Sequence, residues 1–247
     1  MAEVIQWQPL SGDVAILRLK SHKGERFPDY QAGQNIVLSR SGVFMIFSIA
    51  SAPYQTKQRG YLEFFVNREN EFLKGERIQY ANRATGDFTL DRARNFANVV
   101  FVATGTGVAP FVSMIRELSY GGSSGTRYTL IQGSRKFEEL GYYKELSELA
   151  AAGNIDFLYI PTVSRPNAGA WNHTAIGRGR AANLLRLLVH LPLKGEAVLP
   201  APLLKQDFRE CLRMRSTIIL ACGSHASVAD VKNVATERGI RFEKEDW

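Results

Sequence analysis

The hydrophobic pattern of the chain changes near residue 96, and this change limits the folds that the sequence can adopt. Before it, short segments of alternating or continuous apolar residues are separated by turn-rich pieces. Such segments predict strands, and their close spacing is typical of an antiparallel barrel or sandwich. The predicted strands cover residues 13–20, 35–38, 44–49, 61–66 and 77–80.

After residue 96, strand-like and helix-like segments alternate. Val99–Ala103 is a continuous apolar run, which is typical of a strand covered on both faces of a parallel sheet. The alternation predicts βα units and a doubly wound parallel sheet. The predicted strands cover residues 99–103, 128–133, 157–161 and 217–221, and the predicted helices cover 110–118, 138–152, 180–188, 206–214 and 228–238.

Length and composition fit two globular domains. The chain has 247 residues, and single hydrophobic cores stop growing near this size. Hydrophobic residues make up 45% and charged residues 22%, which excludes disordered and fibrous proteins. We therefore predict domains at residues 1–95 and 96–247.

Charge and cysteine content narrow the class of protein further. The net charge of +7 favours an acidic partner or a phosphorylated ligand without requiring nucleic acid. Cys211 and Cys222 cannot form a disulfide framework, and no segment has the pattern of a signal peptide or a membrane span. We therefore expect a soluble cytoplasmic protein. The histidines have no metal-ligand spacing with the cysteines, so we also expect no metal site.

Two glycines lie where the apolar strand at residues 99–103 turns into a helix. Gly105 and Gly107 would let backbone amides approach a ligand, and the N-terminus of a helix attracts a pyrophosphate. Pro110 fits the first helical turn, where its missing N–H costs nothing. An ordinary tight turn explains the same residues, because Gly-x-Gly alone is not the dinucleotide fingerprint. The residues themselves favour phosphate binding only slightly.

Several short motifs follow one another along nearly the whole chain. They are Ala32–Gln34, Phe47–Ser51, Thr85–Leu90, Gly105–Pro110, Gly133–Arg135 with Glu139–Leu140 and Tyr143–Leu146, Pro161–Arg165, and Cys222–Gly223. In this order they resemble the ferredoxin–NADP reductase family, closer to its bacterial members.

The resemblance implies a fold and an activity. The fold is an N-terminal six-stranded antiparallel Greek-key β-barrel that binds flavin, followed by a doubly wound parallel-sheet domain that binds NADP. The activity is hydride transfer between NADPH and bound FAD, with single electrons passed to an acidic ferredoxin or flavodoxin. We also expect a monomer with no nucleic-acid or membrane partner.

The resemblance also assigns site residues. Phe47 would pack on the flavin, Ser48 would lie near its N5 atom, and Cys222 would lie beside the nicotinamide. Trp247 would cover the flavin ring or belong to an exposed tail, and Glu243, Glu245 and Asp246 are candidates for a nearby carboxylate. The candidate catalytic residues are Ser48, Cys222 and Trp247, and the candidate cofactor-binding residues are Met45, Phe47, Ser48, Ile49, Ala50, Ser51, Thr85, Gly105, Thr106, Gly107, Val108, Arg135, Arg165, Arg180 and Gly223.

Two departures from the family pattern concern the flavin pyrophosphate. Met45 stands where the family has an arginine. Only residues 67–72 separate the strand at 61–66 from the turn at 73–76, where the family has a glycine- and serine-containing phosphate-binding loop. Losing one charge-assisted contact of roughly 1.5–3 kcal/mol weakens binding by about tenfold or more. Arg40, Arg68 and Arg83 are possible substitutes. FAD is the leading choice, and the alternatives are weakly held FAD, FMN, or no flavin and a nucleotide-binding regulatory protein. A further alternative is a stand-alone flavin or oxygenase reductase.

Arginines in the second half favour NADP over NAD. Arg135 and Arg165 follow predicted strands, and Arg178 and Arg180 come soon after. Arginine binds a 2′-phosphate bidentately, whereas NAD sites offer a carboxylate to the ribose hydroxyls. Glu138 and Glu139 leave NAD open.

Overall fold

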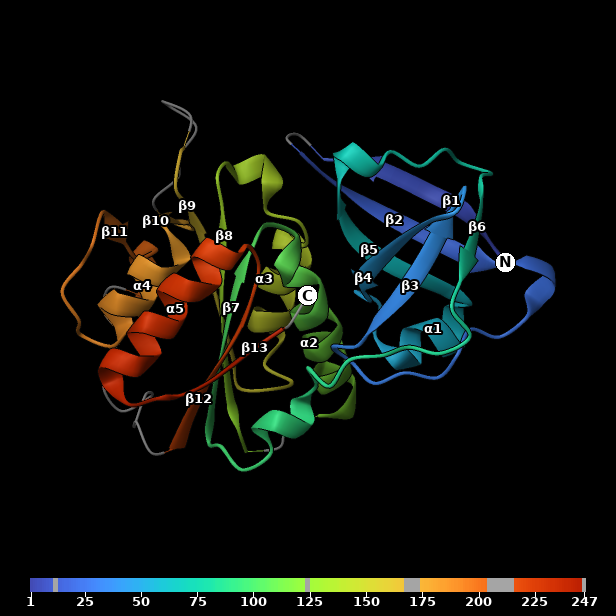
Figure 1. Ribbon diagram of the computed structural model, residues 1–247. Coiled ribbons are helices and arrows are strands. Elements are labelled where there is room, and N and C mark those ends of the chain that lie inside the picture. The colour runs from blue at the N-terminus through green and yellow to red at the C-terminus, as the bar shows by residue number, and fades with distance from the viewer. Residues whose placement is uncertain (11–12, 123–124, 167–173, 204–215, 246–247) are drawn as a thin grey trace. The chain divides into compact units, whose positions relative to one another are not determined.

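The computed structural model describes residues 1–10, 13–122, 125–166, 174–203 and 216–245, and the chain packs as two units (Figure 1). The first unit is Met1–Arg92 with Ala109–Gly121, and the second is Ala93–Val108 with Gly122–Trp247. No helix of the described residues is both long enough and apolar enough to cross a membrane.

The first unit is built on a six-stranded antiparallel sheet in the order β4-β3-β6-β1-β2-β5. An antiparallel bridge between Ile49 and Phe64 joins its two ends, so the sheet curls into a barrel. The helices of this unit are α1 (Pro53–Arg59) and α2 (Ala109–Gly121). The strands are β1 (Ala2–Pro9), β2 (Val14–Ser21), β3 (Asn35–Arg40), β4 (Val43–Ser48), β5 (Tyr61–Asn67) and β6 (Arg77–Tyr80).

Alternation along these strands places one set of side chains in the barrel core. Leu17 and Leu19 of β2, Ile36 and Leu38 of β3, and Phe64 of β5 are fully buried. Successive side chains of a strand point to opposite faces, so residues between these positions lie on the outside. The expected antiparallel barrel is confirmed.

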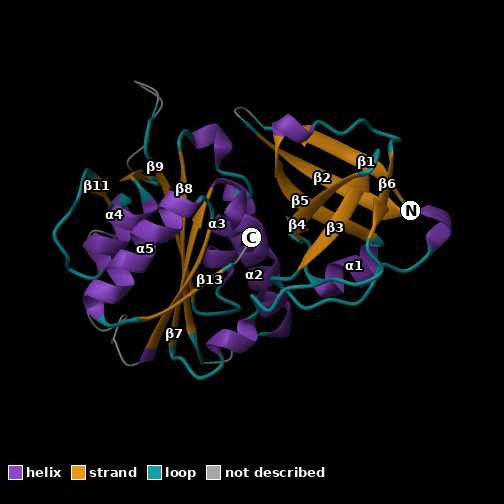
Figure 2. Ribbon diagram, in the orientation of Figure 1, coloured by secondary structure: helices purple, strands orange, loops and turns teal. Residues whose placement is uncertain are grey.

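The second unit holds a seven-stranded sheet in the order β11-β10-β9-β8-β7-β12-β13. All neighbouring strands are parallel except β10 and β11. The strands are β7 (Asn98–Thr104), β8 (Arg127–Ser134), β9 (Phe157–Val163), β10 (Gly177–Gly179), β11 (Ala197–Val198), β12 (Thr217–Cys222) and β13 (Arg241–Lys244). The helices are α3 (Tyr143–Ala152), α4 (Ala181–Leu188) and α5 (His225–Arg238) (Figure 2).

Helices α4 and α5 cover one face of this sheet. Leu184 and Val234 of these helices share a buried cluster with Val100, Ile131 and Ile160 of the strands. Helix α3 packs on β9, where Tyr143 contacts Tyr159, a strand residue of the opposite face. The expected doubly wound parallel sheet is confirmed, and the predicted domain ranges 1–95 and 96–247 stay a prediction.

The helix predicted at residues 138–152 is wrong in its first part. Phe137–Glu139 form a separate 3-10 turn, and α3 begins only at Tyr143. Tyr142 has φ +65, a left-handed conformation that a continuous α-helix does not accommodate. The helix predicted at residues 206–214 lies outside the described residues. The sequence analysis missed β1, α1, β10, β11 and β13.

Candidate functional site

A tight turn joins β7 to α2 at the position of the predicted glycine loop. Gly105–Val108 form a 3-10 turn between Thr104, the last residue of β7, and Ala109, the first of α2. A Cβ atom on Gly107 would lie 2.4 Å from the carbonyl oxygen of Cys222 and 2.6 Å from the Gly223 nitrogen. Both contacts are to backbone, so only glycine fits.

The strand end of β12 packs against that of β7 without intervening side chains. Gly223 has φ +146, and a Cβ there would lie 2.1 Å from Thr104 Oγ1. This hydroxyl oxygen is itself buried, and no partner for it exists among the described residues. The first amides of α2 lie directly after this turn and have no partner within the helix. The backbone amides of Gly105–Val108, together with the Thr104 hydroxyl that lacks a partner among the described residues, fit the phosphates of a nucleotide.

Cys222 forms a buried pair with a carboxylate that comes from the end of the chain. Its Sγ donates a hydrogen bond to Glu245 Oε2 over 2.8 Å, and the two residues are 2% and 7% exposed. Glu245 N also donates to Ala221 O, because the backbone continues beside β12 after β13 ends. Of the two described acidic residues considered at this end of the chain, Glu243 and Glu245, the hydrogen bond from Cys222 goes to Glu245, and Asp246 lies outside the described residues. The predicted Trp247 lies outside the described residues.

The predicted arginines gather at the carboxyl edge of the sheet. Arg135 follows β8 and Arg165 follows β9, and the two segments remain paired because Arg165 N donates to Arg135 O over 2.8 Å. Arg180 immediately precedes α4, whose first residue, Ala181, would lie 3.1 Å from a Cβ on Gly133 of β8. The side chains of Arg135, Arg165 and Arg180 are exposed. Arg178 instead forms an ion pair with Glu196 over 2.9 Å.

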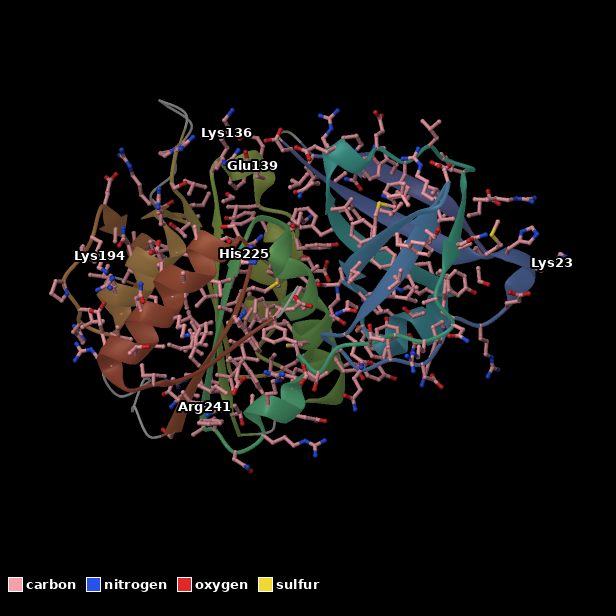
Figure 3. All side chains as sticks on the ribbon, in the orientation of Figure 1. Lys23, Lys136, Glu139, Lys194, His225 and Arg241 are labelled. Atoms are coloured by element: carbon pink, nitrogen blue, oxygen red, sulfur yellow. The ribbon has the colours of Figure 1, made fainter. Side chains whose placement is uncertain are left out.

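One of the two carboxylates that left NAD open, Glu139, is held by its own loop. Glu139 Oε2 accepts hydrogen bonds from the backbone amides of Arg135, over 3.0 Å, and Lys136. Figure 3 shows Lys136 and Glu139 on this segment after β8. Glu139 therefore serves to close the loop.

In the first unit, two predicted positions, Ser48 and Thr85, meet around Asn35. This residue pairs with Ser48 across the β3–β4 hairpin, and its backbone exchanges two hydrogen bonds with Thr85. Thr85 Oγ1 also donates to Asn35 Oδ1 over 2.8 Å. Asn35 therefore lies between Ser48 and Thr85, and the sequence analysis did not single it out.

The residues after Ser48 are anchored deep in the unit. Ile49, Ala50 and Ser51 are at most 1% exposed. The carbonyl oxygen of Ser51 accepts hydrogen bonds from Tyr30 Oη, over 2.9 Å, and from Ser113 Oγ of α2, over 2.8 Å. Burial raises the pKa of Tyr30 to about 12, so this phenol keeps its proton and donates it.

The two faces of β4 differ from what the family motif leads one to expect. Met45 and Phe47 oppose Leu38 and Ile36, so they point toward the barrel core, and the Phe47 ring lies 6.0 Å from that of Phe64. The outer face of the strand carries Phe44 and Ile46, which are 76% and 54% exposed, followed by Ser48. Large exposed apolar side chains on one strand fit a flat aromatic ligand such as an isoalloxazine ring.

Of the arginines considered as substitutes at the flavin pyrophosphate, Arg40 is committed elsewhere. Its guanidinium pairs with Glu76 over 2.6 Å, donates to Glu71 O, and lies 5.2 Å from the centre of the Phe72 ring. Arg68 and Arg83 are exposed.

Comparisons with known proteins agree with this geometry. Residues 101–178 match the family of oxidoreductase NAD-binding domains. The chain is 34% identical over 176 residues to ferredoxin–NADP reductase B of Sorangium cellulosum, covering 66% of this chain and 69% of that protein. The chain belongs to the ferredoxin–NADP reductase-like family of oxidoreductases.

The chain is also similar to a protein named for a hydroxylase. The phenol hydroxylase P5 protein of Acinetobacter pittii is 32% identical over 177 residues, which cover 67% of this chain and 47% of that protein. The chain thus spans about half the length of several curated relatives. A ferredoxin–NADP reductase from Neisseria gonorrhoeae, solved with bound FAD and NADP, has the same fold, with a TM-score of 0.71, 20% identity, and coverage of 98% of this chain and 97% of that one.

Proposed function

We propose that this protein is a flavin-dependent NADPH oxidoreductase. The observation that carries the proposal is the junction of β7 and β12, where Gly107 and Gly223 pack on backbone and Thr104, and a buried Cys222–Glu245 pair lies directly beside them. In a ferredoxin–NADP reductase-like chain, this combination favours a nucleotide whose pyrophosphate lies on Gly105–Val108.

In this proposal the second unit binds and orients the nucleotide. The backbone amides of the glycine turn Gly105–Val108 hold its phosphates, and Thr104 Oγ1 gains a partner. Glu245 accepts a hydrogen bond from the Cys222 thiol and so fixes the direction of Sγ. The first unit binds a flavin, with Ser48 and the outer face of β4 as its contact surface. Bound flavin supplies hydride acceptance and one-electron release, and the protein supplies orientation and exclusion of water.

The choice of FAD rests on the family to which the chain belongs. In the first unit, the residues of β4 support binding of the flavin ring but not of the pyrophosphate. Phe44, Ile46 and Ser48 lie on one face of β4, whereas Met45 provides no charge for a pyrophosphate. We propose that FAD binds with its ring on this face and that Arg83 or Arg68 contacts the phosphates. FMN is the second candidate.

The flavin assignment is tested by titrating the purified protein with FAD and with FMN. We expect saturable quenching of flavin fluorescence, and mass spectrometry of the co-purified cofactor should identify FAD. In the variant Phe44→Ser, loss of apolar contact should weaken flavin binding by about tenfold, since a buried phenylalanine contributes roughly 1.5–3 kcal/mol. Val43→Ser, which removes an exposed apolar side chain from the opposite face of β4, is the control. Absence of saturable binding of either flavin would favour a nucleotide-binding regulatory protein.

Arg165→Ala should distinguish NADPH from NADH. A charge-assisted contact to the 2′-phosphate contributes roughly 1.5–3 kcal/mol, so NADPH binding should weaken by about tenfold or more while NADH binding changes little. Arg178→Ala is the matched control, because Arg178 lies at the same sheet edge but is paired with Glu196. Equal losses for both nucleotides in Arg165→Ala would contradict the assignment.

The electron acceptor is proposed from charge and relatives. A net charge of +7 favours an acidic carrier of the ferredoxin or flavodoxin type, because opposite charges steer association. The similarity to the phenol hydroxylase P5 protein supports a second candidate, the reductase component of an oxygenase.

A further inference from the structure

Helix α2 belongs by its packing to the first unit, although its first residue follows the glycine turn of the second. The helix carries two polar side chains, Ser113 and Arg116, that are 0% and 6% exposed. They are one turn apart and so lie on the same face of the helix. Both donate to the backbone of the segment after Ser48.

The segment Ile49–Ser51 lies beyond the end of β4 and does not continue its regular sheet pairing. Strand β4 ends at Ser48, and the amides of Ala50 and Ser51 both turn to the carbonyl oxygen of Glu63. The carbonyl oxygens of the same two residues receive their hydrogen bonds from α2. Arg116 NH1 donates to Ala50 O over 2.9 Å, and Ser113 Oγ donates to Ser51 O over 2.8 Å. The backbone after Ser48 is therefore fixed from both sides.

A buried charge pair holds Arg116 in this position. The same NH1 donates to Glu63 Oε1 over 2.7 Å, and Glu63, which is fully buried, also accepts from Arg18 Nε over 2.6 Å. Burying charges is costly, and apolar residues of similar volume would pack this helix against the barrel at no such cost. Packing alone therefore does not explain why a guanidinium occupies this site. The need for a donor to the Ala50 carbonyl oxygen does explain it.

We propose that Arg116 is a positioning residue that holds the Ser48–Ser51 segment in the conformation that binds flavin. It acts through the Ala50 carbonyl, and Glu63 orients it. The inference rests on the proposed function, because it presumes that the outer face of β4 contacts the flavin.

The test compares stability with flavin affinity in three variants. Arg116→Met removes the donor and leaves Glu63 short of a partner, so both properties should fall. The double variant Glu63→Gln/Arg116→Met removes both charges, so thermal stability should recover toward wild type while the flavin dissociation constant stays about tenfold or more above it. Arg116→Lys, which keeps a charged donor, should bind flavin within about threefold of wild type.

Binding of NADPH to the same variants is the control, and it should be unchanged because its proposed contacts lie in the second unit. Recovery of flavin affinity together with stability in the double variant would overturn the positioning role. Ser113→Ala gives a second measurement that leaves the charge pair intact, and it should also weaken flavin binding. A wild-type protein that binds no flavin would instead refute the proposed function, and the inference with it.

Discussion

Replacement of Glu63 by leucine is expected to lower the free energy of unfolding by about 3–5 kcal/mol. Glu63 is the acceptor for two arginines, and the Arg116 side chain is only 7% exposed, so the substitution leaves a buried guanidinium without its carboxylate. Urea unfolding at neutral pH measures the loss. The control is Asp156→Asn, which breaks the exposed pair with Arg127 and should cost less than about 1 kcal/mol.

The same carboxylate should make stability depend on pH in the acid range. Burial by itself would raise the pKa of Glu63, but Arg116 and Arg18 outweigh it and hold the pKa below its ordinary value of 4.5. A lowered folded-state pKa contributes stability that is complete above 4.5 and is lost as the pH falls through the folded value. Glu63→Gln should therefore differ from wild type at neutral pH, and the difference should shrink in acid. A difference that stays constant into strong acid would contradict this assignment of charge.

Gly107→Ala is expected to abolish tight nucleotide binding. The added Cβ would lie 2.4 Å from the oxygen and 2.5 Å from the carbon of the Cys222 carbonyl, so β7 and β12 must separate at their ends. The NADPH dissociation constant should rise by more than about tenfold, and the Cys222 thiol, now 2% exposed, should react faster with a thiol reagent. Mass spectrometry of the labelled peptide distinguishes Cys222 from Cys211.

Gly105→Ala is the matched control for this displacement. Gly105 has φ +55, and a Cβ there meets nothing within 4 Å. It should cost roughly 1–2 kcal/mol of left-handed backbone strain without exposing Cys222. Equal thiol reactivity in the two variants would mean that contact between Gly107 and Cys222 does not hold the strand ends together.

Elements with a regular period were predictable from the sequence, and irregular ones were not. Strand β7 was predicted to within a residue or two from the continuous apolar run Val99–Ala103. Strand β2 was predicted equally well from the alternation of apolar and polar residues over 13–20. Strand β1 escaped because a register shift between Val4 and Gln6 interrupts its alternation and only Ala2 and Val4 of it are buried.

Short elements were missed because tertiary pairing defines them. Strand β10 spans only Gly177–Gly179, and a glycine-rich segment carries no strand signal of its own. Strand β13 had a usable signal: Gly239 ends α5 in a left-handed conformation, and in a doubly wound fold the next element is a strand. That strand places Glu245 beside Cys222.

Positions of the candidate site that belong to glycine or serine motifs were predictable from the sequence. Contacts that depend on the direction of a side chain were not. The motif resemblance located Ser48, Gly107 and Gly223. It did not indicate that Phe47 points into the barrel while Phe44 points out, because this depends on the register of β4 against β3. Arg116 was likewise beyond reach, since only the fold brings it to the carbonyl of Ala50.

Anaerobic mixing of the flavin-loaded protein with NADPH tests the central claim most directly. The oxidised-flavin absorbance should bleach with one equivalent of NADPH, and more slowly with the same concentration of NADH. Bleaching should be slower in Gly107→Ala at NADPH concentrations that just saturate the wild-type protein. A protein that binds flavin and NADPH together but leaves the flavin oxidised would contradict the assignment of this chain as an NADPH oxidoreductase.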